Sequence, residues 1–181
     1  MTLSRVRLDE MHERHRGLTQ AVAAAYEEAA SVSLNRYHAP PIEITLSDNG
    51  TETTAELRWL TPDVRTIGAW ANTTDTTENG AYCCVIAGIE LLRSLFAVRR
   101  AETGTGADYY IGPPGSGKND LEDCLRLEVS GVGGGDSQEV RTRLARKVQQ
   151  AREGDSSLPA LAGVIGFSAR LLVVQDVREE A

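Results

Sequence analysis

Residues 81–97 are apolar around almost the whole helix circumference, and this feature constrains the fold more than any other. A helix that is apolar on all sides must be buried by other elements. Its large apolar side chains are Tyr82, Val85, Ile86, Ile89, Leu91, Leu92, Leu95 and Phe96. A chain of 181 residues is long enough to enclose such a helix. We therefore predict one domain over residues 1–181, built around this helix.

The segments after this helix predict strands and one more helix. Residues 98–102, 108–111 and 124–130 are strand-like, and so are residues 162–167 and 170–177. Between the two groups, residues 137–152 carry a helical apolar stripe of Val140, Leu144, Val148 and Ala151. This order predicts an α/β fold over residues 78–177, with a mixed central sheet flanked by helices.

Two further elements are expected before the core. Residues 1–38 predict a helix, because apolar positions recur in steps of three and four at Leu8, Met11, His15, Leu18, Val22, Ala25, Ala29 and Val32. Packing against its own domain is the favoured interpretation, and a homodimer seam is the alternative. Residues 42–60 predict a β-hairpin that turns at Asn49 and Gly50. Residues 72–79 are polar and predict an exposed loop.

Composition limits the classes of function. No run approaches the roughly 20 apolar residues of a membrane span, and residues 1–10 lack the apolar core of a signal peptide. Cys83, Cys84 and Cys124 form no CxxC pair, so neither a disulfide framework nor a zinc site is expected. We expect a cytoplasmic protein without a membrane partner. The net charge of −7 argues against nonspecific coating of nucleic acid, but local charge decides whether an enzyme acts on it.

Two carboxylates are the main candidates for chemistry. Asp108 follows a glycine-containing turn and opens one predicted strand, and Glu128 lies within the next. Side chains placed in this way can converge on one hard cation, such as Mg²⁺ or Mn²⁺. Such a cation polarises a phosphodiester and activates water. The structural alternative is that Asp108 caps a turn and Glu128 points to solvent.

Here the sequence resembles a family. Glu78, the buried helix, the segment VRRAETGTGAD that ends at Asp108, and LEVS at residues 127–130 are similar to the PD-(D/E)xK nuclease superfamily. The likeness is to its Holliday-junction-resolvase and Mrr-like restriction endonuclease branches. It implies a restriction-endonuclease-like sheet and metal-dependent cleavage of DNA in a defence or repair system. It also implies metal ligation by Asp108, Glu128 and the Val129 carbonyl, with Glu78 as an auxiliary carboxylate.

The chain departs from this family at one position. Ser130 stands where the family has a lysine, and a hydroxyl cannot supply positive charge to the transition state. Lys118 or Lys147 could supply that charge instead. The alternative is an inactive relative that acts as a nucleic-acid-binding or protein-interaction module.

The predicted helix at residues 137–152 is rich in cations. Arg141, Arg143 and Lys147 flank its apolar stripe and are candidates for contacts with nucleic-acid phosphates. A solvated basic helix with cations near its C-terminus is the structural alternative.

A second motif predicts a different function. Residues 112–118, which begin at Gly112 and end at Lys118, match the GxxxxGK phosphate-loop pattern and follow an apolar strand. A nucleotide-binding protein is therefore a further alternative. Against it, Asn119 replaces the hydroxyl residue that holds magnesium, and residues 119–124 are too few for the required helix.

Overall fold

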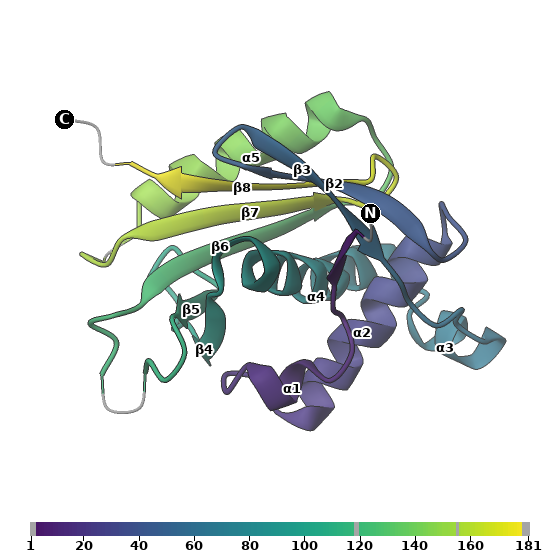
Figure 1. Cartoon of the computed structure of the whole chain (residues 1–181), viewed down its shortest axis with the longest axis horizontal. Helices are drawn as coiled ribbons and strands as arrows, with labels where there is room; N and C mark the ends of the chain where they lie inside the picture. Colours follow the sequence, from purple (N-terminus) through teal and green to yellow (C-terminus); the bar gives the residue numbers. More distant parts are fainter. Residues whose placement is uncertain (1–2, 118–119, 155, 179–181) are drawn as a thin grey trace.

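The computed structural model describes residues 3–117, 120–154 and 156–178 (Figure 1). Lys118 therefore lies outside the described residues. In chain order, the elements are β1 (Ser4–Val6), α1 (Met11–Arg14), α2 (Gln20–Asn35), β2 (Ile42–Asp48), β3 (Thr51–Leu57), α3 (Val64–Ala69), α4 (Thr73–Arg93), β4 (Phe96–Arg100), β5 (Tyr109–Gly112), β6 (Leu125–Val132), α5 (Ser137–Arg152), β7 (Ala160–Gly166) and β8 (Leu171–Val177).

One mixed sheet organises the fold. Its eight strands follow the order β1-β3-β2-β8-β7-β6-β5-β4. The pairs β1/β3, β2/β8 and β6/β7 are parallel, and the other pairs are antiparallel. The predicted α/β class with a mixed central sheet is confirmed. The hairpin of β2 and β3 extends this sheet, because β2 pairs with β8.

Helices cover both faces of the sheet. Helices α2 and α4 lie on one side, and α5 packs on β6, β7 and β8 from the other (Figure 1). Two glycines of β7 show how closely the layers approach. A Cβ atom at Gly163 would lie 2.4 Å from Val85 of α4, and one at Gly166 would lie 2.3 Å from Val140 of α5. The sheet is therefore the middle layer of the molecule.

Helix α4 is the buried helix expected from the sequence, but it starts earlier than predicted. Its N-cap is Asn72, whose side chain accepts hydrogen bonds from the backbone N–H groups of Thr74 and Asp75. Residues 73–79 are thus the first turns of a helix, so the prediction of a loop was wrong, although most of the segment is exposed as predicted. Thr76 explains the error, because it is fully buried and its hydroxyl donates to Trp70 O at 2.7 Å. Polar residues favour a loop, but the side chains of Asn72, Thr76 and Asn79 bond to nearby backbone groups and support a helix instead.

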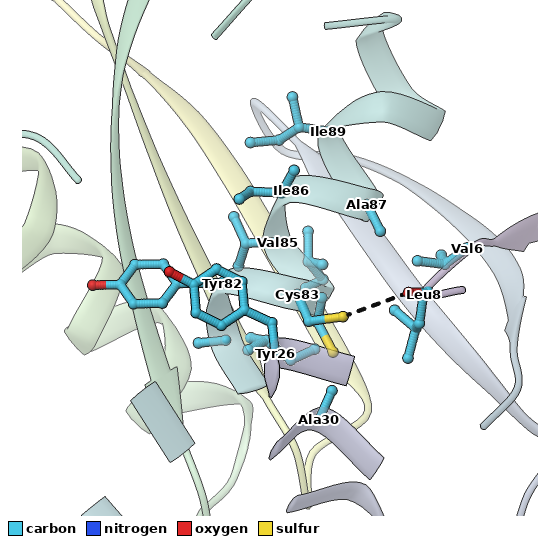
Figure 2. Packing of buried hydrophobic residues seen from close by; sticks show 14 of the residues in the cluster. Val6, Leu8, Tyr26, Ala30, Tyr82, Cys83, Val85, Ile86, Ala87 and Ile89 are labelled. Carbon is cyan, nitrogen blue, oxygen red and sulfur yellow. Dashed lines mark hydrogen bonds between the residues drawn. The ribbon is translucent and has the colours of Figure 1, made fainter. Parts of the chain in front are cut away.

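The core around α4 combines aliphatic, aromatic and sulfur-containing side chains. Val85, Ile86 and Ile89 pack beside Tyr26 of α2, while the Cys83 thiol donates to Leu8 O at 3.9 Å (Figure 2). Val85 faces the sheet at Gly163, whereas Cys83 faces the segment at Leu8 on another side of the helix.

The N-terminal segment is not one continuous helix. It contains β1, α1 and α2, so the prediction of a helix over residues 1–38 was wrong. Most of the predicted stripe is nevertheless buried inside this chain, as the favoured interpretation required, and Val22 is the stripe residue that is clearly exposed. The chain then reaches the sheet edge, where Gly17 N donates to Ala97 O and Ala97 N donates to His15 Nδ1. A side chain at Gly17 would collide with Arg99 N at 2.7 Å.

The predicted strands of the core all form, with bounds that shift by at most two residues, and α5 has the predicted bounds. Helix α5 begins with a capping box in which Asp136 and Glu139 satisfy each other's backbone N–H groups. Among the described residues, no helix has the length and apolarity needed to cross a bilayer.

Candidate functional site

The pairing of two adjacent strands places Asp108 opposite Glu128. Strands β5 and β6 are antiparallel, with Tyr109 opposite Leu127. The backbone N–H of Asp108 donates to Leu127 O at 2.7 Å. The side chain of Asp108 then turns towards β6, where its Oδ2 accepts from Val129 N at 2.8 Å. The Asp108 carboxylate is therefore fixed beside the Glu128–Val129 peptide.

These residues face a surface cleft of about 1460 Å³. The cleft lies between the N-terminal half of α4, the turn before β5, strand β6 and one face of α5. Seven residues singled out from the sequence line it: Glu78, Asp108, Glu128, Val129, Ser130, Arg143 and Lys147. Arg141 is not among its lining residues and instead pairs with Glu52 at 3.1 Å.

Glu128 is buried and has a cationic partner. The residue is 3% exposed, and its Oε1 accepts from Lys147 Nζ at 2.6 Å. Burial raises the pKa of Glu128, the neighbouring Asp108 carboxylate raises it further, and Lys147 opposes both effects. The structural alternative of a Glu128 that points to solvent is therefore wrong. Asp108 precedes β5 directly, and the pairing of Tyr109 with Leu127 places Asp108 opposite Glu128.

Asp108 is held by two residues that the sequence did not indicate. Tyr82 OH donates to Asp108 Oδ1 at 2.9 Å, and Arg100 lies 3.5 Å from the same oxygen. Arg100 also donates to Tyr82 OH at 2.9 Å and lies over the Tyr82 and Tyr109 rings, at 4.5 Å and 4.9 Å from their centroids. Burial, and next the Asp108 charge, raises the pKa of Tyr82, so its phenol remains a hydrogen-bond donor.

The missed residues had a weak signal in the sequence. Tyr82 lies four residues after Glu78, so both occupy one face of α4. Its hydroxyl is 3.4 Å from Glu78 Oε1. Tyrosine in an apolar helix suggests only core packing, and nothing in the chain before Asp108 distinguishes Arg100 from Arg99. Spatial convergence was needed to find them.

Strand β6 and helix α5 run in opposite directions with a regular register. Arg126 Nη1 donates to Ala151 O at 2.9 Å, and Lys147 donates to Glu128. One helical turn earlier on α5, Arg143 Nη1 donates to Ser130 Oγ at 3.4 Å. Alternate strand residues thus meet every fourth helix residue, since two strand residues and one helical turn span similar lengths. The position without a lysine therefore receives a guanidinium from the helix.

The donor set fits a hard cation only in part. Within the described residues, no three His, Cys, Asp or Glu side chains form a group that could hold a metal ion. Asp108 and Glu128 supply two carboxylates beside the Val129 peptide, and oxygen ligands of this kind suit Mg²⁺ or Mn²⁺. Mg²⁺ commonly takes one or two protein carboxylates and completes its shell with water and substrate oxygens. The two carboxylates are compatible with that mode of binding.

The residues that match the phosphate-loop pattern connect two strands, whereas a phosphate loop connects a strand to a helix. Its described residues, 112–117, leave β5 through turns, and β6 begins at Leu125. Strands β5 and β6 are antiparallel neighbours. In the described part of this connection, residues 120–124 are not helical, whereas a phosphate loop opens directly into a helix.

Comparisons with protein-family models, curated proteins and solved structures gave no significant match.

Proposed function

We propose that this protein is a divalent-cation-dependent phosphodiesterase that cleaves DNA in a defence or repair system. The observation that carries the proposal is the meeting of Asp108 and buried Glu128 across β5 and β6, with Lys147 on Glu128, in an open cleft. A buried carboxylate whose pKa is raised, as that of Glu128 is, is a common feature of a functional site when it lines a cleft.

The order of elements supports the proposal. Helix α4 precedes the antiparallel strands β4, β5 and β6, and α5 then leads to β7, which is parallel to β6. The two helices cover opposite faces (Figure 1). This arrangement agrees with what the sequence resemblance to PD-(D/E)xK nucleases implies for residues 78–177.

The side chains have distinct roles in this proposal. Asp108, Glu128 and the Val129 carbonyl would hold the cation, which polarises a phosphodiester and lowers the pKa of water when bound. Tyr82 and the Val129 N–H orient the Asp108 carboxylate. Lys147 opposes the effect of burial and helps to keep Glu128 ionised. Glu78 lines the cleft, and its Oε1 lies 3.4 Å from the Tyr82 hydroxyl.

A second candidate is a binding module without catalysis. Ser130 leaves strand β6 without the cation that the family carries there. Lys147, the described lysine that could replace it, already contacts Glu128 and Gln150. The same cleft would then bind nucleic acid or a protein partner and leave it intact.

A cleavage assay separates these two functions. The protein is incubated with labelled duplex, branched or single-stranded DNA in Mg²⁺, Mn²⁺ or EDTA. We expect cleavage with a divalent cation, loss of cleavage in Asp108→Asn and Glu128→Gln, and no loss in Glu52→Gln, which alters a carboxylate outside the cleft. If no DNA is cut in any buffer, the binding module is the better function.

A further inference from the structure

We propose that Arg143 and Arg146 form an anion-binding subsite in the cleft and that its ligand is a phosphate of a nucleic-acid backbone. The choice of nucleic acid rests on the proposed function. The subsite itself rests on the charges and contacts of the cleft, and it lies on helix α5 next to the carboxylate pair.

The cleft contains four cationic side chains, and two of them are already paired. Lys147 contacts Glu128, and Arg100 contacts Asp108. By contrast, Arg143 has only the uncharged Ser130 hydroxyl as a partner, and Arg146 has no hydrogen-bond or ion-pair partner among the described residues. Both arginines are exposed and line the cleft. They are therefore available to an anion from solution.

Their spacing favours a shared ligand. Arg143 and Arg146 are three residues apart on α5, so their side chains leave the same face of the helix. Two neighbouring positive charges repel each other, and an anion between them removes that repulsion. A guanidinium donates from a planar fork that matches two phosphate oxygens. The Ser130 hydroxyl limits the positions that the Arg143 side chain adopts before the ligand arrives.

The subsite lies at a useful distance from the carboxylates. Ser130 and Glu128 are two residues apart on β6, which corresponds to about 6–7 Å along the strand. One strand of duplex DNA advances about 3.4 Å per nucleotide along the helix axis. Because the strand winds around the axis, successive phosphates are further apart in space than this axial rise, so a backbone phosphate at Arg143 would be about one or two nucleotides from a phosphodiester at Asp108 and Glu128.

The net charge of the cleft would not attract a phosphate. Carboxylates outnumber cations on its walls, because Glu78, Glu102, Asp136, Glu139 and Glu153 also line it. A phosphate would meet a net negative surface everywhere except beside the two unpaired arginines. Binding should therefore depend on these two side chains rather than on the total charge of α5.

The test measures binding rather than cleavage. A short fluorescein-labelled DNA duplex is titrated with the full chain, in Ca²⁺ and in EDTA, and anisotropy is recorded at several salt concentrations. The variants are Arg143→Gln, Arg146→Gln and the matched control Arg141→Gln. Arg141 has the same charge on the same helix but is paired with Glu52 outside the cleft. Far-UV circular dichroism confirms that each exposed substitution leaves the fold intact.

We expect Arg143→Gln and Arg146→Gln each to weaken binding about tenfold, as for loss of a hydrogen bond to a charged group. Each should also reduce the salt dependence by about one ion, while Arg141→Gln changes the affinity less than about twofold. Equal losses in all three variants, unchanged affinity in both cleft variants, or no binding by the wild type in either buffer would overturn the subsite. Binding without cleavage would refute the phosphodiesterase and leave the subsite supported.

Discussion

Lys147 Nζ lies 2.6 Å from Glu128 Oε1, and this contact joins a partly exposed helix cation to a carboxylate buried in the sheet. The pair links α5 to β6 in the middle of the cleft. A buried carboxylate without a partner is costly, so the contact contributes both to stability and to the ionisation state of the candidate site.

Lys147→Met should destabilise the protein by about 1–3 kcal/mol near pH 8, because the ionised Glu128 loses its partner. The pKa of Glu128 is already raised by burial and should rise further. A raised carboxyl pKa stabilises the fold at pH values below the normal pKa of glutamate, and this contribution is lost as pH rises through the folded-state pKa. The cost of Lys147→Met should therefore shrink towards pH 5, as measured by urea unfolding. In a Glu128→Gln background the cost should be small at both pH values, and an equal cost in both backgrounds would contradict the role of the pair.

Mg²⁺ or Mn²⁺ should raise the melting temperature if Asp108 and Glu128 hold a cation. At about ten times the dissociation constant, binding to the folded state adds about 1.4 kcal/mol, or about 3–5 °C for a chain of this size. Asp108→Asn and Glu128→Gln should each abolish the rise, whereas Glu52→Gln should retain it. Thermal unfolding with and without the cation is the measurement, and the same rise in all variants would place the cation elsewhere.

Ser130→Lys should introduce repulsion with Arg143, since the Ser130 hydroxyl already accepts a hydrogen bond from that guanidinium. We expect a loss of about 0.5–1 kcal/mol that Arg143→Ser reverses in the double variant. Chemical denaturation of the two single variants and the double variant gives the coupling energy directly. A coupling energy near zero would show that the two side chains do not meet in solution.

His15 should make stability depend on pH in the acidic range. It is fully buried, its Nδ1 accepts from Ala97 N and its Nε2 donates to Glu90. Burial lowers the pKa of His15, although Glu90 opposes the effect. The unfolded chain therefore binds this proton more readily, so stability is retained above about pH 6.5 and falls as pH drops through the folded-state pKa.

His15→Gln should flatten this dependence between about pH 5 and pH 6.5, because glutamine carries no titrating proton in this range. His12→Gln is the matched control on the same segment, since the His12 side chain has no hydrogen bond among the described residues. Denaturant midpoints across the pH range test the difference, and an unchanged slope in His15→Gln would assign the effect to other groups.

The strands and helices of the core could be predicted from the sequence, because a pattern among neighbouring residues indicates each of them. The period-two strands and the apolar stripe of α5 lie close to where they were predicted, since each pattern follows the geometry of one element. The start of α4 could not be predicted, because it depends on side-chain bonds of Asn72 and Thr76 to backbone groups, and a polar sequence does not reveal these bonds. The N-terminal segment was misassigned because a three-to-four spacing also occurs when separate elements each bury one face.

The candidate site was only partly visible for a related reason. The sequence indicates four candidate residues by the chemistry of their side chains, and the structure brings them to one cleft: Asp108, Glu128, Arg143 and Lys147. Their pairing could not be predicted, because it depends on the register between β6 and α5. Tyr82 and Arg100 were missed altogether, since their contacts with Asp108 join residues that are 26 and 8 positions apart in the chain.

The segment before α2 touches both ends of the sheet. Strand β1 pairs with β3 at one end, while His15 and Gly17 bond to Ala97 of β4 at the other. Deleting residues 1–18 would therefore leave two unpaired strand edges on opposite sides of one molecule. Each edge is a template for another chain, and head-to-tail pairing of two different edges does not close on itself. We therefore expect the shortened chain, which exposes the longer edge of β3 in place of the three-residue β1, to be more prone to open-ended association than the full chain.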